Sequence, residues 1–153
     1  MTPLLSIRGL RTWFYTESGV AKAVDGVDLD IAPGEVLGLV GESGSGKSVT
    51  ALSILRLIPE PPGKIVEGQI LFRGRDLLTM SWDEIRAVRG ADISMVFQEP
   101  MTSLNPVFTI GRQVTEVIHA HEASSARDAE ARAIEMLTEV GIPDPADRKS
   151  TRL

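Results

Sequence analysis

Cysteine is absent from this 153-residue sequence, and aromatic residues make up only 5% of it. The lack of cysteine excludes a disulfide framework or a thiolate metal site within these residues. No stretch approaches about 18 consecutive apolar residues, so the sequence predicts no membrane-spanning helix. The first residues, MTPLLSIRGL, lack the basic region and long apolar run of a secretory signal. We therefore expect any link to a membrane to come through a partner protein.

Positive charge is also scarce. The sequence holds 16 Lys and Arg against 21 Asp and Glu, which gives a formal net charge of −5, and it has no basic cluster. This balance excludes a general nucleic-acid surface, so we expect no nucleic-acid partner. The 42% of hydrophobic residues is enough to bury the core of one ordinary domain.

The most informative motif is the octapeptide GESGSGKS at residues 41–48, which fits the phosphate-binding pattern G-x-x-x-x-G-K-[ST]. Apolar residues 36–40 precede it, and residues 49–58 follow it and stop at Pro59. This order predicts a strand, a glycine-rich loop and a helix. In such a loop, backbone N–H groups converge on a phosphate at the helix N-terminus, where the helix dipole also favours an anion.

Two side chains of the motif have expected roles. Lys47 would reach the β- and γ-phosphates, and the Ser48 hydroxyl would help to hold Mg²⁺, so ATP and Mg²⁺ are the expected ligands. A flexible glycine turn is the plainer alternative, but the pattern arises by chance in roughly one chain in 200 of this length. The nucleotide-contacting residues of the loop would be Gly41, Glu42, Ser43, Gly44, Ser45, Gly46, Lys47, Ser48 and Val49.

Local patterns predict the other elements. Residues 4–15 mix apolar, β-branched and aromatic side chains, and residues 20–31 alternate with period two, so both are expected strands on either side of a turn at 16–19. Residues 68–72 and 93–97 are further expected strands, the latter buried. Asp25, Asp28 and Asp30 are expected on the solvated face of an edge strand rather than in a metal cluster.

Helices are expected in the rest of the chain. Ser81 and Glu84 form the capping-box pattern S-x-x-E, which predicts a short helix that begins near Trp82. A helix is expected at about 110–121, where His119 and His121 are two positions apart, do not share a face and read as a solvated helix end. A last helix should begin at a Ser124 or Ser125 cap and end at Gly141. Its expected apolar face consists of Ile134, Leu137 and Val140.

Several segments together resemble one family, the ATP-binding subunits of ABC transporters, and most closely the oligopeptide, dipeptide and nickel importer subfamily. The segments are VGESGSGKS at 40–48, EGQILFRGRDL at 67–77, ISMVFQEPMTSLNP at 93–106 and VGIPDPADR at 140–148. The resemblance covers about residues 4–148. It implies an α/β fold of the P-loop NTPase class: an antiparallel β subdomain, the P-loop strand and helix, and the start of a helical subdomain.

The resemblance also implies roles for single residues. Gly41, Gly44, Gly46, Lys47 and Ser48 match the family's Walker A positions. Gln98 matches the Q-loop glutamine, which contacts Mg²⁺ and the water near the γ-phosphate, so Lys47 and Gln98 are the expected catalytic residues, and Ser48 and Gln98 the expected metal-site residues. Phe14 matches the aromatic that stacks on adenine, and Tyr15 is the neighbouring candidate; a core or hairpin aromatic remains the alternative for both.

Partners follow from the same resemblance. In the family, the region of residues 98–106 receives a coupling helix of the membrane subunits; an ordinary surface loop is the alternative. Two ATP-binding subunits, identical or different, sandwich two ATP molecules at the cytoplasmic face of the membrane, and a solute-binding protein outside the cytoplasm is expected in the full system. The expected function is ATP-driven import of peptides or a related solute such as nickel.

Three motifs of the family are not found in the sequence: LSGGQ, the Walker B strand with its catalytic Glu, and the switch His. We therefore expect residues 4–148 to be part of a nucleotide-binding domain that is not hydrolytically competent alone. Residues 149–153 depart from the family pattern, and DRKSTRL at 147–153 looks like one reading frame of a common sequencing-adapter DNA. A non-native tail is therefore expected at 149–153, with a natural divergent tail as the alternative. Two other functions remain open, a stand-alone P-loop small-molecule kinase and a nucleotide-binding module without catalysis.

Overall fold

The computed structural model describes residues 2–98 and 104–148, and the chain divides into two compact units, Met1–Arg89 and Gly90–Leu153. We call them unit 1 and unit 2 and describe each by itself. Among the described residues, no helix is long and apolar enough to cross a membrane.

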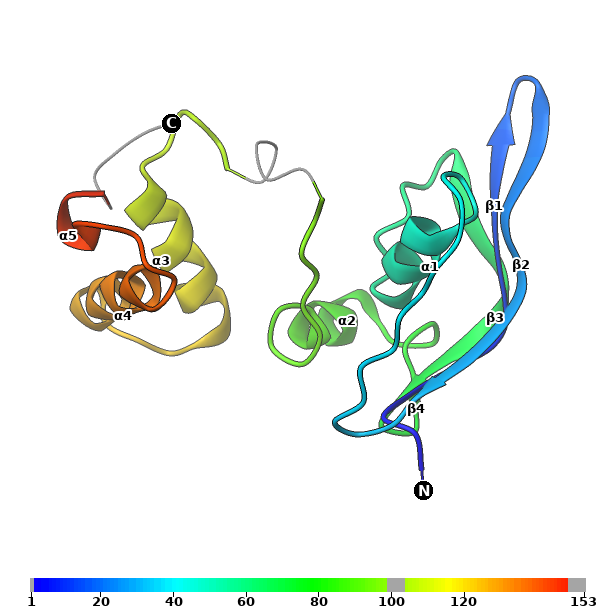
Figure 1. Cartoon of the computed structure of the whole chain (residues 1–153), viewed down its shortest axis with the longest axis horizontal. Coiled ribbons are helices and arrows are strands. Elements are labelled where there is room, and N and C mark those ends of the chain that lie inside the picture. Colours follow the sequence, from blue (N-terminus) through cyan, green and yellow to red (C-terminus); the bar gives the residue numbers. More distant parts are fainter. Residues whose placement is uncertain (1, 99–103, 149–153) are drawn as a thin grey trace. The chain divides into compact units, whose positions relative to one another are not determined.

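Unit 1 is built on a four-stranded antiparallel sheet with the order β2-β1-β3-β4 (Figure 1). The strands are β1 (Leu5–Thr16), β2 (Gly19–Ile31), β3 (Gly63–Phe72) and β4 (Arg75–Asp76). A tight turn joins β1 to β2, and β1 pairs on its other side with β3, which begins opposite Phe14. The three long strands confirm the predicted strands, although β3 begins five residues earlier than the sequence pattern indicates.

Ion pairs and hydrogen bonds join β1 to the edge strand β2. Asp30 pairs with Arg8 at 2.8 Å, Asp25 with Arg11 at 3.2 Å, and Asp28 accepts a hydrogen bond of 2.8 Å from the backbone N–H of Gly9. The hydrogen bond from the Arg8 guanidinium holds the pKa of Asp30 below its ordinary value. The three aspartates are exposed on an edge strand, as the sequence predicts.

Helix α1 (Lys47–Ile54) lies over one face of this sheet (Figure 1). Its Ser53 hydroxyl is 2.9 Å from the Thr12 hydroxyl of β1, and both side chains are fully buried. Satisfied buried hydroxyls of this kind fix the position of a helix, because leaving either one without a partner costs about 1–3 kcal/mol. The apolar core around them consists mainly of Ile7, Leu10, Ile70, Leu77 and Ile85.

Helix α1 ends before the position that the sequence predicts. Its last residue is Ile54 rather than a residue next to Pro59, because Arg56 adopts a left-handed backbone with φ 51°. The N–H of Arg56 bonds the carbonyl of Ser53 at 3.0 Å, and the N–H of Leu57 bonds that of Leu52 at 2.9 Å. This pattern is a Schellman motif, which closes a helix and is usually formed with glycine at the left-handed position.

Helix α2 (Trp82–Val88) completes unit 1 and confirms the predicted capping box. The Ser81 hydroxyl accepts from the N–H of Glu84 at 3.3 Å, and the Glu84 carboxylate accepts from the N–H of Ser81 at 2.9 Å. The helix buries Ile85 and Val88, so both a polar motif and two apolar side chains hold this short element.

Unit 2 contains α3 (Ile110–His121), α4 (Ala126–Glu139) and the short α5 (Pro145–Arg148), which the sequence did not predict. The bounds of α3 and the Ser125 cap of α4 confirm the predictions. The apolar face of α4 is shifted from the predicted one: Ala129 and Ala133 pack with Ile118 and Val114, while Val140 is 73% exposed. Small alanines let the two helices approach, and they are a weak sequence signal because alanine is common at any helix position.

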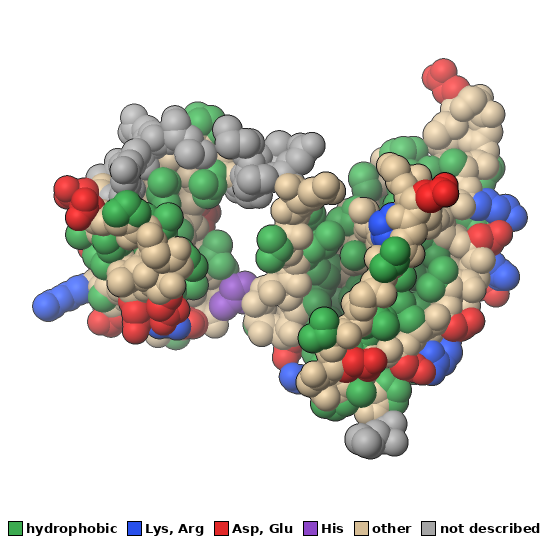
Figure 2. All heavy atoms as spheres, in the orientation of Figure 1, with side chains coloured by type: hydrophobic (Ala, Val, Ile, Leu, Met, Phe, Trp, Pro, Cys, Tyr) green, Lys and Arg blue, Asp and Glu red, His purple; other side chains and the backbone are tan. Residues whose placement is uncertain are grey.

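Two predicted strands are not formed. Residues 36–40 and 94–97 are assigned to no sheet, with only a single bridge at Ile93. Val36 and Val40 are 96% and 93% exposed, and Val96 is 94% exposed. The prediction rested on apolar runs, whereas a strand also needs a neighbouring strand to accept its hydrogen bonds, and no described strand pairs with these residues. Figure 2 shows hydrophobic side chains uncovered over a wide area of unit 1.

Candidate nucleotide-phosphate site

The glycine-rich loop leads directly into the N-terminus of α1. The N-cap residue is Gly46, no side chain caps this end, and the first turn carries no acidic residue. Helices α2, α3 and α4, in contrast, each have a side-chain N-cap, from Ser81, Thr109 and Ser125 respectively. The first N–H groups of α1 therefore remain available to an external acceptor, and the helix dipole favours an anion there.

Space around the loop requires glycine at position 46 and is tight at position 41. A Cβ atom on Gly46 would lie 2.2 Å from the carbonyl oxygen of Ala23 on β2, and Gly46 also has a left-handed φ of 89°. A Cβ atom on Gly41 would lie 2.6 Å from the Ser45 hydroxyl. The loop is thus folded tightly on itself and against the sheet, which brings its backbone close to whatever it binds.

Lys47 directs its ammonium group into the loop. Nζ donates to the carbonyl oxygens of Gly41 at 2.9 Å and Glu42 at 2.6 Å, and lies 3.2 Å from the Ser45 hydroxyl. These contacts hold a positive charge beside the uncapped N-terminus of α1. Phosphate oxygens are stronger acceptors than carbonyl oxygens, so a phosphate group at this point would receive charge-assisted hydrogen bonds from Nζ.

The structure thus brings together the loop residues expected to bind phosphate. Gly41 to Ser45 are exposed, Gly46 and Lys47 are half-buried, and Ser48 is exposed in the first turn of α1. The uncapped end of α1, the glycine-rich loop and the inward-directed Lys47 ammonium all fit a polyphosphate. A role of the Ser48 hydroxyl as a metal ligand stays a prediction. Val49 follows in the helix and offers its backbone N–H.

Phe14 and Tyr15 lie near the end of β1. Phe14 is half-buried opposite Gly63, and its Cε1 is 3.0 Å from where a Cβ on Gly63 would be. Tyr15 is 48% exposed, and its N–H donates to the carbonyl of Pro62 at 2.9 Å. An adenine-stacking role for either ring stays a prediction.

Gln98 belongs to unit 2 and is exposed directly after residues 94–97, which form no helix or sheet strand. Of the loop expected to receive membrane subunits, residues 99–103 lie outside the described residues, as does the expected non-native tail at 149–153. His119 and His121 are exposed, and Nδ1 of His119 is 3.4 Å from the Ser124 hydroxyl.

Sequence reasoning missed two arginines at the far end of α1. Arg89 donates to the carbonyls of Leu55 and Arg56, and Arg56 donates to the carbonyl of Met80. An arginine after a predicted helix is a frequent signal of contact with its last carbonyls, but the sequence does not show which helix it will cap. A cleft of about 530 Å³ beside Arg56, Gly63 and Trp82 includes no residue of the glycine-rich loop.

Comparisons with known proteins agree with the geometry. A family model described as "ABC transporter" matches residues 24–153. The chain is 53% identical over 146 residues to the peptidoglycan transport ATP-binding protein YejF of Agrobacterium fabrum, with 95% of the chain and 27% of that protein covered. It is 49% identical over 148 residues to the oligopeptide transport ATP-binding protein OppD of Bacillus subtilis, with 97% and 41% covered.

A solved structure extends the comparison to the fold. The chain superposes with a TM-score of 0.78 and 23% identity on a dimeric ATP-binding cassette, MJ0796, solved in a post-hydrolysis state with ADP and Pi, over 97% of the chain and 61% of the cassette. The fold class predicted from sequence is thereby confirmed. The chain spans less than half the length of the two curated relatives named above.

Proposed function

Since the chain belongs to the ABC transporter family, we propose that its full-length parent is an ATP-binding subunit that couples ATP binding and hydrolysis to the import of peptides. The observation that carries ATP binding is the glycine-rich loop with Lys47 at an N-terminus of α1 that no side chain caps. The oligopeptide and peptidoglycan transport named for the relatives supports a peptide-like solute. Nickel, another solute of the subfamily that the sequence resembles, is a weaker candidate because neither relative named above carries nickel in its name.

The residues of this chain have distinct parts in the proposed activity. The N–H groups of residues 44–49 and the Lys47 ammonium bind the β- and γ-phosphates of ATP. Ser48 and Gln98 are the proposed oxygen donors to Mg²⁺, which when bound neutralises charge on the phosphates. Gln98 also orients water next to the γ-phosphate, and Phe14 or Tyr15 stacks on adenine.

Hydrolysis needs groups beyond these residues, because phosphoryl transfer depends on a positioned water, metal and charge together. We propose that the parent supplies them in a Walker B strand, a catalytic Glu and a switch His, and that a second ATP-binding subunit completes each site with LSGGQ. The exposed apolar segments at 36–40 and 93–97 support this proposal, since both need neighbouring strands. The membrane subunits bind at residues 98–106 on the cytoplasmic face, and a solute-binding protein delivers the peptide.

Solute-stimulated ATP hydrolysis tests the proposal. The full-length parent is reconstituted in liposomes with its membrane subunits and their solute-binding protein. We expect phosphate release to rise when a mixture of di- to hexapeptides is present together with the binding protein. Nickel chloride in place of the peptides serves as the matched alternative solute.

The label of γ-³²P-ATP distinguishes the other functions. An importer subunit releases the label as inorganic phosphate, whereas a small-molecule kinase would transfer it to an acceptor in a metabolite extract. ATP binding without turnover in the reconstituted system would leave the non-catalytic module as the function.

A further inference from the structure

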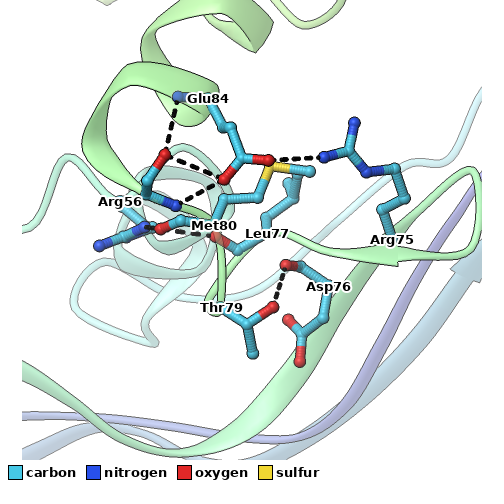
Figure 3. A network of polar contacts seen from close by, with 8 residues as sticks. Arg56, Arg75, Asp76, Leu77, Thr79, Met80 and Glu84 are labelled. Atoms are coloured by element: carbon cyan, nitrogen blue, oxygen red, sulfur yellow. Dashed lines mark hydrogen bonds and ion pairs between the residues drawn. The ribbon is translucent and has the colours of Figure 1, made fainter.

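Two arginines tie the C-terminal end of α1 to both ends of α2. Arg56 Nη1 donates to the carbonyl of Met80 at 2.6 Å and is 3.5 Å from that of Leu77, just before α2 begins (Figure 3). Arg89, just after α2 ends, donates through Nε to the carbonyl of Leu55 at 2.8 Å and through Nη2 to that of Arg56 at 2.9 Å. The two ties run in opposite directions, so α1 and α2 are joined at two points.

The Trp82 ring lies close to both guanidinium groups. Its ring centroid is 4.4 Å from Cζ of Arg56 and 5.9 Å from Cζ of Arg89, both within the range of cation–π attraction. Burial, followed by the nearby charges of Arg56 and Arg86, lowers the pKa of Arg89 from its ordinary value. Two like charges are thus held close to one ring by carbonyl acceptors. We call these three residues the Arg56–Trp82–Arg89 clamp.

The backbone of Arg56 indicates that its side chain matters. The same Schellman motif closes α4, where Gly141 occupies the left-handed position with φ 75°. At the end of α1 an arginine adopts φ 51°, a conformation that L-residues with a side chain avoid. Strain of this kind persists where the surrounding contacts require it, and here the contacts are those to Met80 and Trp82.

The clamp stands between the phosphate site and the start of the segment that leads to Gln98. Helix α1 begins at Lys47 and has eight residues, which span about 12 Å at 1.5 Å per residue. A helix this short moves as a rigid body, so displacement of its N-terminus also displaces its C-terminal end. Arg89 holds that end, and the next residue, Gly90, opens the segment 90–98.

Resting on the proposed function, we propose that the Arg56–Trp82–Arg89 clamp is a positioning element that passes the response of the P-loop to ATP from α1 to the segment 90–98. Its residues do not touch the nucleotide. They fix the end of α1 to the residue from which the Gln98 segment starts. Without the clamp, ATP binding at the P-loop no longer changes that segment.

Amide hydrogen exchange of the full-length parent, with and without ATP, measures both ends of this path. Arg89→Lys keeps the charge but loses the planar fork that reaches two adjacent carbonyls. Arg56→Gly removes the side chain and keeps the left-handed cap, because glycine favours that backbone. Arg86→Gln is the matched control, since the exposed Arg86 lies on α2 and forms an ion pair with the exposed Asp83.

We expect ATP to protect residues 41–48 equally in all four proteins, and the ATP-dependent change at residues 90–98 to fall at least about fivefold in Arg89→Lys and Arg56→Gly but not in Arg86→Gln. An unchanged response at 90–98 in both clamp variants would overturn the proposal. So would an equal loss at both segments in both variants, since the clamp would then serve only to keep the fold. If ATP protects residues 41–48 in no protein, the proposed function itself fails.

Discussion

Lys47 is the residue on which nucleotide binding is expected to depend most. Lys47→Ala in the full-length parent should abolish ATP hydrolysis and weaken ATP binding, because each charge-assisted hydrogen bond of Nζ contributes about 1.5–3 kcal/mol. Equilibrium binding of a fluorescent ATP analogue and phosphate release measure the two effects. Lys64→Ala, on the exposed face of β3, is the control and should match the parent. Near-normal affinity and turnover in Lys47→Ala would refute the P-loop assignment.

Gln98 is expected to act after binding. Gln98→Ala should leave ATP affinity within about threefold of the parent, since one neutral hydrogen bond contributes about 0.5–1.5 kcal/mol, and should reduce hydrolysis or its stimulation by solute. Gln69→Ala, an exposed glutamine on β3, is the matched control. A loss of affinity as severe as that of Lys47→Ala would contradict a separate role for Gln98.

Single residues were predictable from sequence where their contacts are local. The phosphate-loop residues follow one another in the chain, so the motif itself specifies their arrangement around Lys47. Arg56 and Arg89 were not predictable, because their partners lie 24 and 34 positions away in sequence. Gly46 was predictable in part. The motif requires a glycine there, but only the structure shows that the carbonyl of Ala23 excludes a side chain.

At the scale of the element, the capping box of α2 gives a direct prediction. Ser81→Ala removes the acceptor for the N–H of Glu84 and should destabilise α2 by about 1 kcal/mol, equal to about fivefold faster amide exchange at 84–88. Ser81→Thr keeps a hydroxyl at the N-cap and serves as the control. Equal exchange in Ser81→Ala and the parent would show that the cap contributes little to the stability of α2.

The other half of the capping box responds to pH. Hydrogen bonds from the Ser81 N–H and hydroxyl, with Arg75 nearby, hold the pKa of Glu84 below its ordinary value (Figure 3). Because the folded-state pKa is the lower one, ionised Glu84 stabilises α2 above the ordinary carboxyl range, and this contribution is lost as pH falls through the lowered value. Glu84→Gln should therefore speed α2 exchange relative to the parent at pH 7 and progressively less at pH values below about 4. If the ratio of the α2 exchange rates in Glu84→Gln and the parent did not change with pH, the proposed role of ionised Glu84 would be contradicted.

Elements were predicted well where the signal lies within the element. The alternation in β2 and the caps of α2, α3 and α4 act between residues close in sequence, so these elements begin close to where the sequence indicates. The end of α1 depends on the left-handed backbone of Arg56, and arginine has a high helix propensity, so the local sequence does not indicate that the helix ends there. The predictions of strands at 36–40 and 93–97 were wrong because a strand needs a neighbouring strand, and the local sequence pattern does not show whether a neighbour is present.

At the scale of the whole molecule, the exposed apolar segments predict behaviour in solution. The isolated 153-residue chain should be poorly soluble, since Val36, Val40 and Val96 are more than 90% exposed beside unpaired backbone groups. Size-exclusion chromatography with light scattering and a thermal melt test this. A monodisperse monomer with a sharp cooperative melt would contradict it, and charged substitution at Val36 and Val40 should reduce aggregation if these residues cause it.

The apolar segment at 36–40, just before the P-loop, also affects the chain during its synthesis. In the proposed parent, residues 36–40 have no strand partner until the proposed Walker B strand has been synthesised. Ribosomes add about 5–20 residues each second, so every hundred residues of delay keep this apolar segment waiting for about 5–20 s. During that interval β1, β2 and β3 already have their antiparallel partners, whereas residues 36–40 have none. The nascent chain therefore offers molecular chaperones a defined binding stretch immediately before the P-loop.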